Sequence, residues 1–435
     1  MTRFGSAILL WFLAWPSTGQ AETRRLSLER ARELALKQHP RIGAAAARIR
    51  QAEARLAEAR SLYYPRVLAA AEYLRGTSNN SPTTVLSVPN LPRIGGPTRD
   101  PRLESFDNAF LGVTSDLTLY DFGATHAVVE EGKARAAVAQ AALRASQADV
   151  VLTVAEAYIA VLASRGTLAV VEEALERARK HRELVQAGVT SGLRGRIELA
   201  RADAEVASIR VARIRAEGAA TLARQALADA IGSGNDEVDA TTDPIVPELT
   251  VRAEAALDDA RRRRPEIDLV RAELRALEAQ RDAAHATYYP RLFATGALST
   301  RGQLTPDVYN WDVGAVLAWP IFTGGSTEHQ VQAAEARIAE VSEHLRLLEQ
   351  DISFEVRRAL SGIAVARETI VAGQAQVDAA RVALELAEGR YQKGLGNIIE
   401  LADAEAGRSA AELGLIQGRY ELARAGALLE HARGQ

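Results

Sequence analysis

The stretch Tyr63-Tyr64-Pro65-Arg66 marks the point where a helical sequence pattern changes into a strand pattern, and the same four residues return as Tyr288-Tyr289-Pro290-Arg291. Other segments on either side of these tetrads also occur in pairs and keep the same order. The pairs include residues 117–122 with 317–322, and Ile197-Glu198-Leu199-Ala200 with Ile399-Glu400-Leu401-Ala402. A long unit that occurs twice in the sequence restricts the possible architectures more than any single motif does.

The repeated segments predict how the chain is divided. A first structural repeat is expected over residues 22–232 and a second over residues 251–435, with a polar, proline-containing linker over residues 233–250 between them. Each repeat should contain a helix, two strands and a long helical hairpin. A chain of 435 residues would usually suggest two or three globular domains, and a duplicated elongated unit is the competing interpretation.

Residues 1–21 are typical of a secretory signal peptide. Arg3 gives a positive start, residues 7–14 form a short apolar run, and small residues precede the expected cleavage after Ala21. The apolar run is shorter than the about 20 residues that a membrane-spanning helix needs. No later stretch is expected to span a membrane as a helix either, so the sequence predicts an exported protein without a transmembrane helix.

Composition excludes several function classes. The chain has no cysteine, so it forms no disulfide and no thiolate metal site, and its formal net charge of −3 gives no support for nucleic-acid binding. Its seven histidines include no His-x-x-x-His pair, and no nucleophile or glycine-rich phosphate motif stands in a convincing context. We therefore predict that the protein is not an enzyme, with no catalytic residue, no metal site and no cofactor.

The spacing of proline predicts very long helices. No proline lies between Pro101 and Pro244 or after Pro320, and alanine, leucine, glutamate and arginine dominate these spans. The two longest helices should each be roughly 95–100 Å long at 1.5 Å per residue. The expected helices are residues 123–186 and 326–392, their return partners 196–231 and 397–433, and the shorter helices 40–62 and 265–287.

Each repeat also contains two strand candidates with alternating residues. Along one of them, apolar residues share one face from Trp311 to Trp319, and a similar face begins near Leu111. The strands that start at Arg66 and Arg291 alternate less cleanly. An apolar face with tryptophan at both ends is what a lipid-facing strand requires, although an amphipathic sheet of a soluble domain shows the same alternation. Trp311 and Trp319 are the predicted membrane-interface aromatics.

Four strands cannot close a barrel, because spanning barrels start at about eight strands. An open sheet edge in lipid would leave backbone groups unpaired. Two chains would supply eight strands with a filled interior, whereas three chains would supply twelve strands with a lumen. The sequence therefore predicts an α+β fold of mostly long α-helices. If the strands enter a membrane and form a channel, three chains are expected to share one transmembrane β-barrel.

The Tyr-Tyr-Pro junctions resemble those of the TolC-like outer-membrane efflux and secretion channels of Gram-negative bacteria. The same is true of the strand-to-helix junctions Tyr-Asp-Phe-Gly and Pro-Ile-Phe-Thr-Gly-Gly, and of the segment from Tyr391 to Ala404. The resemblance covers nearly the whole chain. It implies a homotrimer with a twelve-stranded outer-membrane β-barrel, continued by a periplasmic α-helical coiled-coil barrel.

The same resemblance implies a function and partners. The protein would be the outer-membrane component of a tripartite efflux or type I secretion system and would passively conduct substrates to the exterior. It would work with a periplasmic adaptor (membrane fusion) protein, an inner-membrane pump and outer-membrane lipid, and without nucleic acid. The alternative from another class is a periplasmic coiled-coil adaptor or scaffold protein without a pore.

The resemblance also implies a narrow periplasmic aperture ringed by acidic residues. The matching positions are Glu400 and Asp403, which lie on one helix face at i, i+3 spacing and depart from the commoner pattern by having glutamate first. Carboxylates from three chains around one axis would attract cations, whereas two solvated charges are the plain alternative. Glu198 is the counterpart in the first repeat, and Arg201 replaces the second acid there, so Arg201 is expected to pair across the tip.

The two hairpin turns are predicted from their glycines and are also expected to contact the adaptor. Turn formation alone accounts for glycine at these positions. The resemblance implies the second role, because in these channels the tips meet the hairpins of the adaptor. The residues concerned are Gly188, Gly192, Leu193, Gly394, Leu395 and Gly396.

Overall fold

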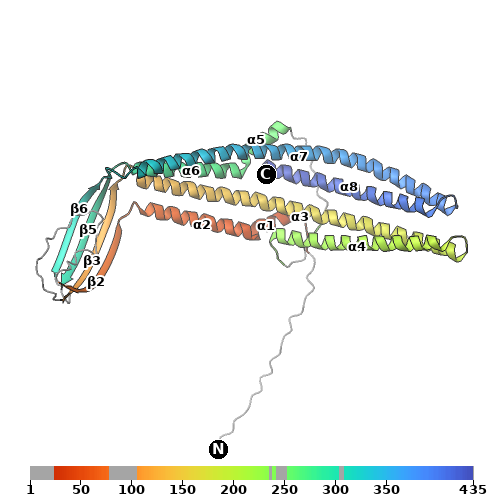
Figure 1. Ribbon diagram of the computed structural model, residues 1–435, viewed down its shortest axis with the longest axis horizontal. Coiled ribbons are helices and arrows are strands. Elements are labelled where there is room, and N and C mark those ends of the chain that lie inside the picture. Colours follow the sequence, from red (N-terminus) through yellow and green to blue (C-terminus); the bar gives the residue numbers. More distant parts are fainter. Residues whose placement is uncertain (1–23, 78–104, 235–237, 242–251, 303–307, 435) are drawn as a thin grey trace, which may run out of the picture.

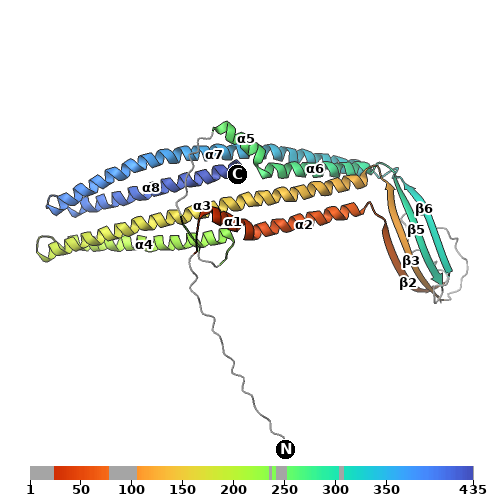
Figure 2. The same cartoon turned by 180° about the vertical axis from the view of Figure 1, so that it is seen from behind.

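The structure is a computed structural model that describes residues 24–77, 105–234, 238–241, 252–302 and 308–434. The predicted signal peptide and most of the loop between the first two strands lie outside these residues. The described chain is elongated, with a β-sheet at one end and two helical hairpin turns at the other (Figures 1 and 2). The two repeats contain the same elements in the same order.

The elements of the first repeat are α1 (Leu28–Gln38), α2 (Pro40–Ser61), β2 (Arg66–Thr77), β3 (Ser105–Tyr120), α3 (Ala124–Thr190) and α4 (Arg196–Ile231). Those of the second are α5 (Ala253–Arg263), α6 (Pro265–Ala286), β5 (Arg291–Gly302), β6 (Val308–Ala318), α7 (Ser326–Gln392) and α8 (Ile398–Ala432). Two short strands, β1 (Arg24–Leu26) and β4 (Val238–Ala240), complete the set.

The two long helices confirm the prediction from proline spacing. Helices α3 and α7 have 67 residues each, or about 100 Å, and α3 continues four residues beyond the predicted end at Gln186. The helices α1 and α2 are interrupted at His39, and α5 and α6 at Arg264. Both residues precede a proline and have extended ψ angles, of 129° and 117°, because a proline disfavours the α conformation in the residue before it.

Each long helix is covered by shorter helices laid end to end. Helix α3 packs along α2 and α4, and α7 packs along α6 and α8. Helix α3 also packs against α6 and α8 of the other repeat. The two hairpins, α3–α4 and α7–α8, therefore meet along a seam between α3 and α8.

Helix α3 is long and apolar enough to cross a membrane by length and composition, a feature that the sequence analysis missed. Its apolar residues Val150, Val154 and Tyr158 are almost fully buried in a core cluster with α1 and α4. Because these side chains pack against protein, the apolar stretch belongs to the core of the helical part.

One strand of a small parallel sheet, β4, lies within the segment predicted to be a polar linker. Strand β4 pairs with β1 in register from Arg24 opposite Val238, and Val238 is buried in the same cluster as Tyr158. The Tyr158 hydroxyl donates to the Leu26 carbonyl at 3.2 Å and accepts from the Thr241 amide at 3.2 Å. Residues 238–241 of the predicted linker are thus anchored to α3.

The larger sheet has four antiparallel strands in the order β2-β3-β5-β6. Its strands have 11 to 16 residues, enough to cross the hydrocarbon core of a bilayer when tilted. The predicted apolar face of β6 is open to the surroundings, with Trp311 77% and Trp319 61% exposed. Strands β2 and β6 are both edge strands without a second neighbour in the described chain.

The junction between sheet and helices is rich in aromatic residues. Phe122 adopts a positive φ of 53° and stacks on Tyr289 of the other repeat at 5.1 Å between ring centroids. The indole nitrogen of Trp319 donates to the Tyr288 carbonyl at 3.1 Å. Aromatic side chains gather where a membrane protein meets the interface of the bilayer, so this end of the molecule has the character of an interfacial belt.

Candidate functional site

The two hairpin turns lie side by side at the end of the molecule opposite the sheet (Figure 1). Gly192 and Gly394 adopt left-handed conformations with φ of 75° and 70°, which favour glycine. The amide of Leu193 donates to the Gly188 carbonyl at 2.9 Å. The turns leave Leu193 84% and Leu395 70% exposed, so each hairpin presents one leucine at its tip.

Arg194 connects the two hairpins. Its Nη1 donates to Glu198 Oε2 at 3.0 Å and its Nη2 donates to the Tyr391 carbonyl at 3.0 Å. The guanidinium also lies over the Tyr391 ring, 3.7 Å from the centroid. Gly188 makes room for this arrangement, because a Cβ at that position would lie 2.7 Å from Arg194 Cδ.

Tyr391, at the end of α7, is 1% exposed and donates its hydroxyl to Glu198 Oε2 at 3.1 Å. Burial, aided by the Glu198 carboxylate and opposed by Arg194, raises the pKa of Tyr391 to about 12. Burial also acts to raise the pKa of Glu198, but hydrogen bonds from Arg194 and Tyr391 prevail and hold it below its usual value. We call Arg194, Glu198 and Tyr391 the tip lock, since they join α4 to α7 through a charged carboxylate.

The structure places the four predicted aperture residues in different surroundings. Glu198 belongs to the tip lock. Glu400 is half-buried and forms an ion pair with Arg390, with 2.9 Å between Oε1 and Nε, which ties the acid to its own hairpin. Asp403 and Arg201 are exposed and line the same cavity, but no ion pair of Arg201 occurs among the described residues. Arg194, which sequence reasoning overlooked, contacts Glu198 and the other hairpin, and the pairing of Arg201 across the tip stays a prediction.

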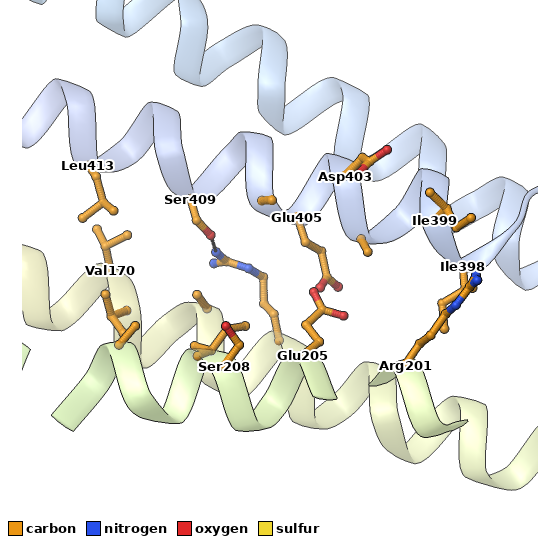
Figure 3. A pocket seen from close by; sticks show the side chains of 17 residues that line it. Val170, Arg201, Glu205, Ser208, Ile398, Ile399, Asp403, Glu405, Ser409 and Leu413 are labelled. Atoms are coloured by element: carbon orange, nitrogen blue, oxygen red, sulfur yellow. Dashed lines mark hydrogen bonds between the residues drawn. The ribbon is translucent and has the colours of Figure 1, made fainter. Parts of the chain in front are cut away.

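A cavity of about 540 Å³ lies between the two hairpins, a short way along the helices from the turns toward the sheet (Figure 3). Its wall is formed by α3, α4 and α8, and it combines apolar side chains with a few charged ones. The carboxyl groups of Glu205 and Glu405 face each other across it in Figure 3. Two acids from different helices are thus held together inside the protein.

His181 of α3 lies behind this pair of acids. Its ring meets the Tyr391 ring edge to face, with centroids 5.3 Å apart, and its Nδ1 is 3.9 Å from Glu405 Oε1. Burial, followed by the nearby Glu205, raises the pKa of Glu405 to about 8. Burial, followed by the charge of Arg194, lowers the pKa of His181. Sequence reasoning missed this cluster, because its members come from three helices.

Ion pairs continue along the seam between α3 and α8. Arg408 Nη2 contacts Glu173 Oε1 at 3.0 Å, and Arg424 Nε contacts Glu156 Oε1 at 2.9 Å. Beside the tip lock, by contrast, an apolar cluster that includes Val185 and Leu401 spans both hairpins. Half-exposed ion pairs contribute only about 0–1 kcal/mol each, so near the tip the apolar cluster is expected to contribute more to the contact between the hairpins than such an ion pair does.

Comparison with known proteins identifies the family of this chain. Residues 31–233 and 256–435 match the family described as outer membrane efflux protein. Protein CyaE of Bordetella pertussis is 28% identical over 407 residues, which cover 90% of this chain and 81% of that protein.

Two solved structures share the fold. The outer membrane protein VceC of Vibrio cholerae superimposes with a TM-score of 0.78 at 22% identity, covering 94% of this chain and 96% of the other. CusC of Escherichia coli superimposes with a TM-score of 0.82 at 19% identity, covering 98% and 96%. The matches confirm the resemblance to TolC-like channels, and the chain belongs to the outer membrane efflux protein family, as an outer-membrane efflux channel whose helical part lies in the periplasm.

Proposed function

We propose that three copies of this chain form one export channel, with a shared twelve-stranded barrel in the outer membrane and a helical tunnel below it. The observation that carries this proposal is the four-stranded sheet with two open edges, β2 and β6, and an exposed apolar face. Each unpaired backbone group in lipid costs several kcal/mol. Pairing of β6 in one chain with β2 in the next satisfies both edges at once.

The channel is passive in this proposal and works as the outer component of a tripartite efflux or type I secretion system. An inner-membrane pump supplies the driving force, and a periplasmic adaptor joins the pump to the hairpin tips. The exposed Leu193 and Leu395 support this docking role, because both turns display an apolar side chain at the far end of the molecule. The neighbouring glycines allow the turns to be tight.

We further propose that the tip lock holds the periplasmic end closed. Arg194 and Glu198 belong to one hairpin and Tyr391 to the other, so opening by separation of the hairpins must break their contacts. Glu400 and Asp403 lie on α8 just beyond the turn and are proposed to face the axis of the trimer. Their carboxylates would favour cations in the narrow opening.

Light scattering of the detergent-solubilised protein, corrected for bound detergent, together with bilayer recordings tests the proposal. A trimer that conducts ions supports the channel. A stable monomer without conductance refutes it and favours the adaptor or scaffold function. Among the described elements nothing favours that alternative, because the four-stranded sheet with an exposed apolar face suits a membrane better than a periplasmic scaffold.

A further inference from the structure

Three side chains with metal-binding atoms converge from three helices above the tip. They are His181 of α3, Glu205 of α4 and Glu405 of α8, and one ligand atom from each lies within 4.8 Å of the others. Figure 3 shows the two carboxyl groups pointing at each other across the space between α4 and α8. The tip lock does not use these residues.

The burial of His181 without hydrogen-bond partners points to a bound ligand. The residue is 7% exposed, and neither ring nitrogen has a hydrogen-bond partner. Nearly all buried polar groups in proteins are hydrogen-bonded, so a buried imidazole with two unsatisfied nitrogens requires an explanation. Its Nδ1 lies 3.9 Å from Glu405 Oε1, a distance that is too long for a hydrogen bond.

The pKa shifts within the cluster also suit a bound cation. Glu405 is 7% exposed, and burial together with the adjacent Glu205 raises its pKa to about 8. Burial lowers the pKa of His181, which leaves the imidazole neutral with a lone pair to donate. A cation between the three groups would accept that lone pair and would also neutralise the two carboxylates.

We propose that His181, Glu205 and Glu405 form a binding site for one divalent transition-metal ion of the zinc class. Imidazole and carboxylate donors together suit Zn²⁺, which takes three protein ligands and leaves a fourth position for water. Metal–ligand distances are about 2.0–2.2 Å, so the side chains need to close only slightly around the ion. Glu205 and Glu405 line the cavity of about 540 Å³, so an ion in that cavity reaches two of the three ligands directly.

The bound ion would connect the α3–α4 hairpin to α8. A ligand that binds only when these helices are together stabilises that arrangement. Zinc is therefore expected to favour the closed hairpin contact. This consequence rests on the proposed function, whereas the binding site itself does not.

A second group of possible ligands provides an internal control. Asp149, Glu266 and His431 also lie close together, but His431 Nε2 is already 3.2 Å from Asp149 Oδ1. Its Nδ1 lies 3.3 Å from Nη1 of Arg264, whose positive charge opposes a cation there. Because its histidine already has partners, this group is not expected to bind a metal ion.

Calorimetric titration of the untagged, EDTA-treated protein with ZnCl₂ tests the site. We expect one Zn²⁺ per chain, no competition from Mg²⁺, and at least a tenfold loss of affinity in both H181Q and E405Q. The control variant H431Q should bind as the wild type does. E405Q is expected to fold, because it removes a buried acid and keeps the shape of the side chain.

Three results would overturn the proposal: no saturable Zn²⁺ binding, equal affinity in wild type, H181Q and E405Q, or loss of binding in H431Q alone. Native mass, measured on the same samples, keeps this test separate from that of the channel. A trimer that does not bind Zn²⁺ refutes only the metal site. A monomer that binds Zn²⁺ at these residues refutes only the channel.

Discussion

Replacing Tyr391 by phenylalanine should shift the channel toward its open state. The change removes the hydroxyl that donates to Glu198 Oε2 at 3.1 Å and leaves the buried ring in place. A hydrogen bond to a charged group contributes about 1.5–3 kcal/mol, and Glu198 keeps Arg194 as a second partner. Because this second partner remains, we expect a loss of about 1–1.5 kcal/mol per chain, at or just below the lower limit of that range.

The proposed trimer multiplies this effect. If the three tips open together, the closed state loses about 3–4.5 kcal/mol relative to the open state. Since about 1.4 kcal/mol corresponds to a factor of ten, the closed-to-open ratio should fall by roughly 10²–10³. Single-channel recording in planar bilayers measures this ratio as the fraction of time that the channel conducts.

Tyr158→Phe is the matched control for this experiment. Tyr158 is as deeply buried, and its hydroxyl donates to the Leu26 carbonyl at 3.2 Å, but it lies in the core cluster that anchors β1 and β4. This variant should lower stability and leave the open fraction unchanged. The reasoning is refuted if Tyr391→Phe trimers open no more often than wild type, or if Tyr158→Phe opens the channel equally.

Three further outcomes are expected. Gly188→Ala should also raise the open fraction, because the added Cβ would displace Arg194. Gly389→Ala should leave the open fraction unchanged, since nothing lies within 4 Å of a Cβ at that position. Recordings that rank the two variants the other way would contradict this. In metal-free protein the folded state holds the Glu405 proton more tightly than the unfolded state, so thermal stability should fall as pH rises from about 4.5 to about 8, each pKa unit contributing about 1.4 kcal/mol. Melting curves of E405Q should lose this slope, and an equally steep slope would assign it to another group. Glu400→Ala combined with Asp403→Ala should weaken cation preference in reversal-potential measurements, and unchanged selectivity would remove both residues from the aperture.

The sequence was most informative where local rules dominate. The proline-free spans predicted α7 at residues 326–392 and α4 at residues 196–231 with the observed bounds, because helix propensity and proline act within a few residues. Alternation predicted a strand from Trp311 onward, and β6 spans Val308–Ala318 with apolar side chains exposed. Strands β1 and β4 escaped prediction, since three residues carry no recognisable pattern.

The candidate site was predicted only in part. Glu198 was singled out from its repeat position, but its partners Arg194 and Tyr391 were not. Tyr391 is nearly two hundred positions away in the sequence, and no local pattern records a contact between two hairpins. Arg194 carried a weak signal, because it precedes Glu198 at the i, i+4 spacing of helical ion pairs. The cluster around His181 depends on three helices and was invisible for the same reason.

Cross-linking of the sheet edges tests the central claim most directly. The chain has no cysteine, so a variant with Val67→Cys in β2 and Leu317→Cys in β6 offers only these two thiols. Both positions are exposed and lie on opposite edge strands at the helix end of the sheet. Treatment of the protein in membranes with a bismaleimide should give a covalent trimer as the largest product, whereas products that remain monomeric, stop at dimers or extend beyond trimers would contradict a barrel closed by three chains.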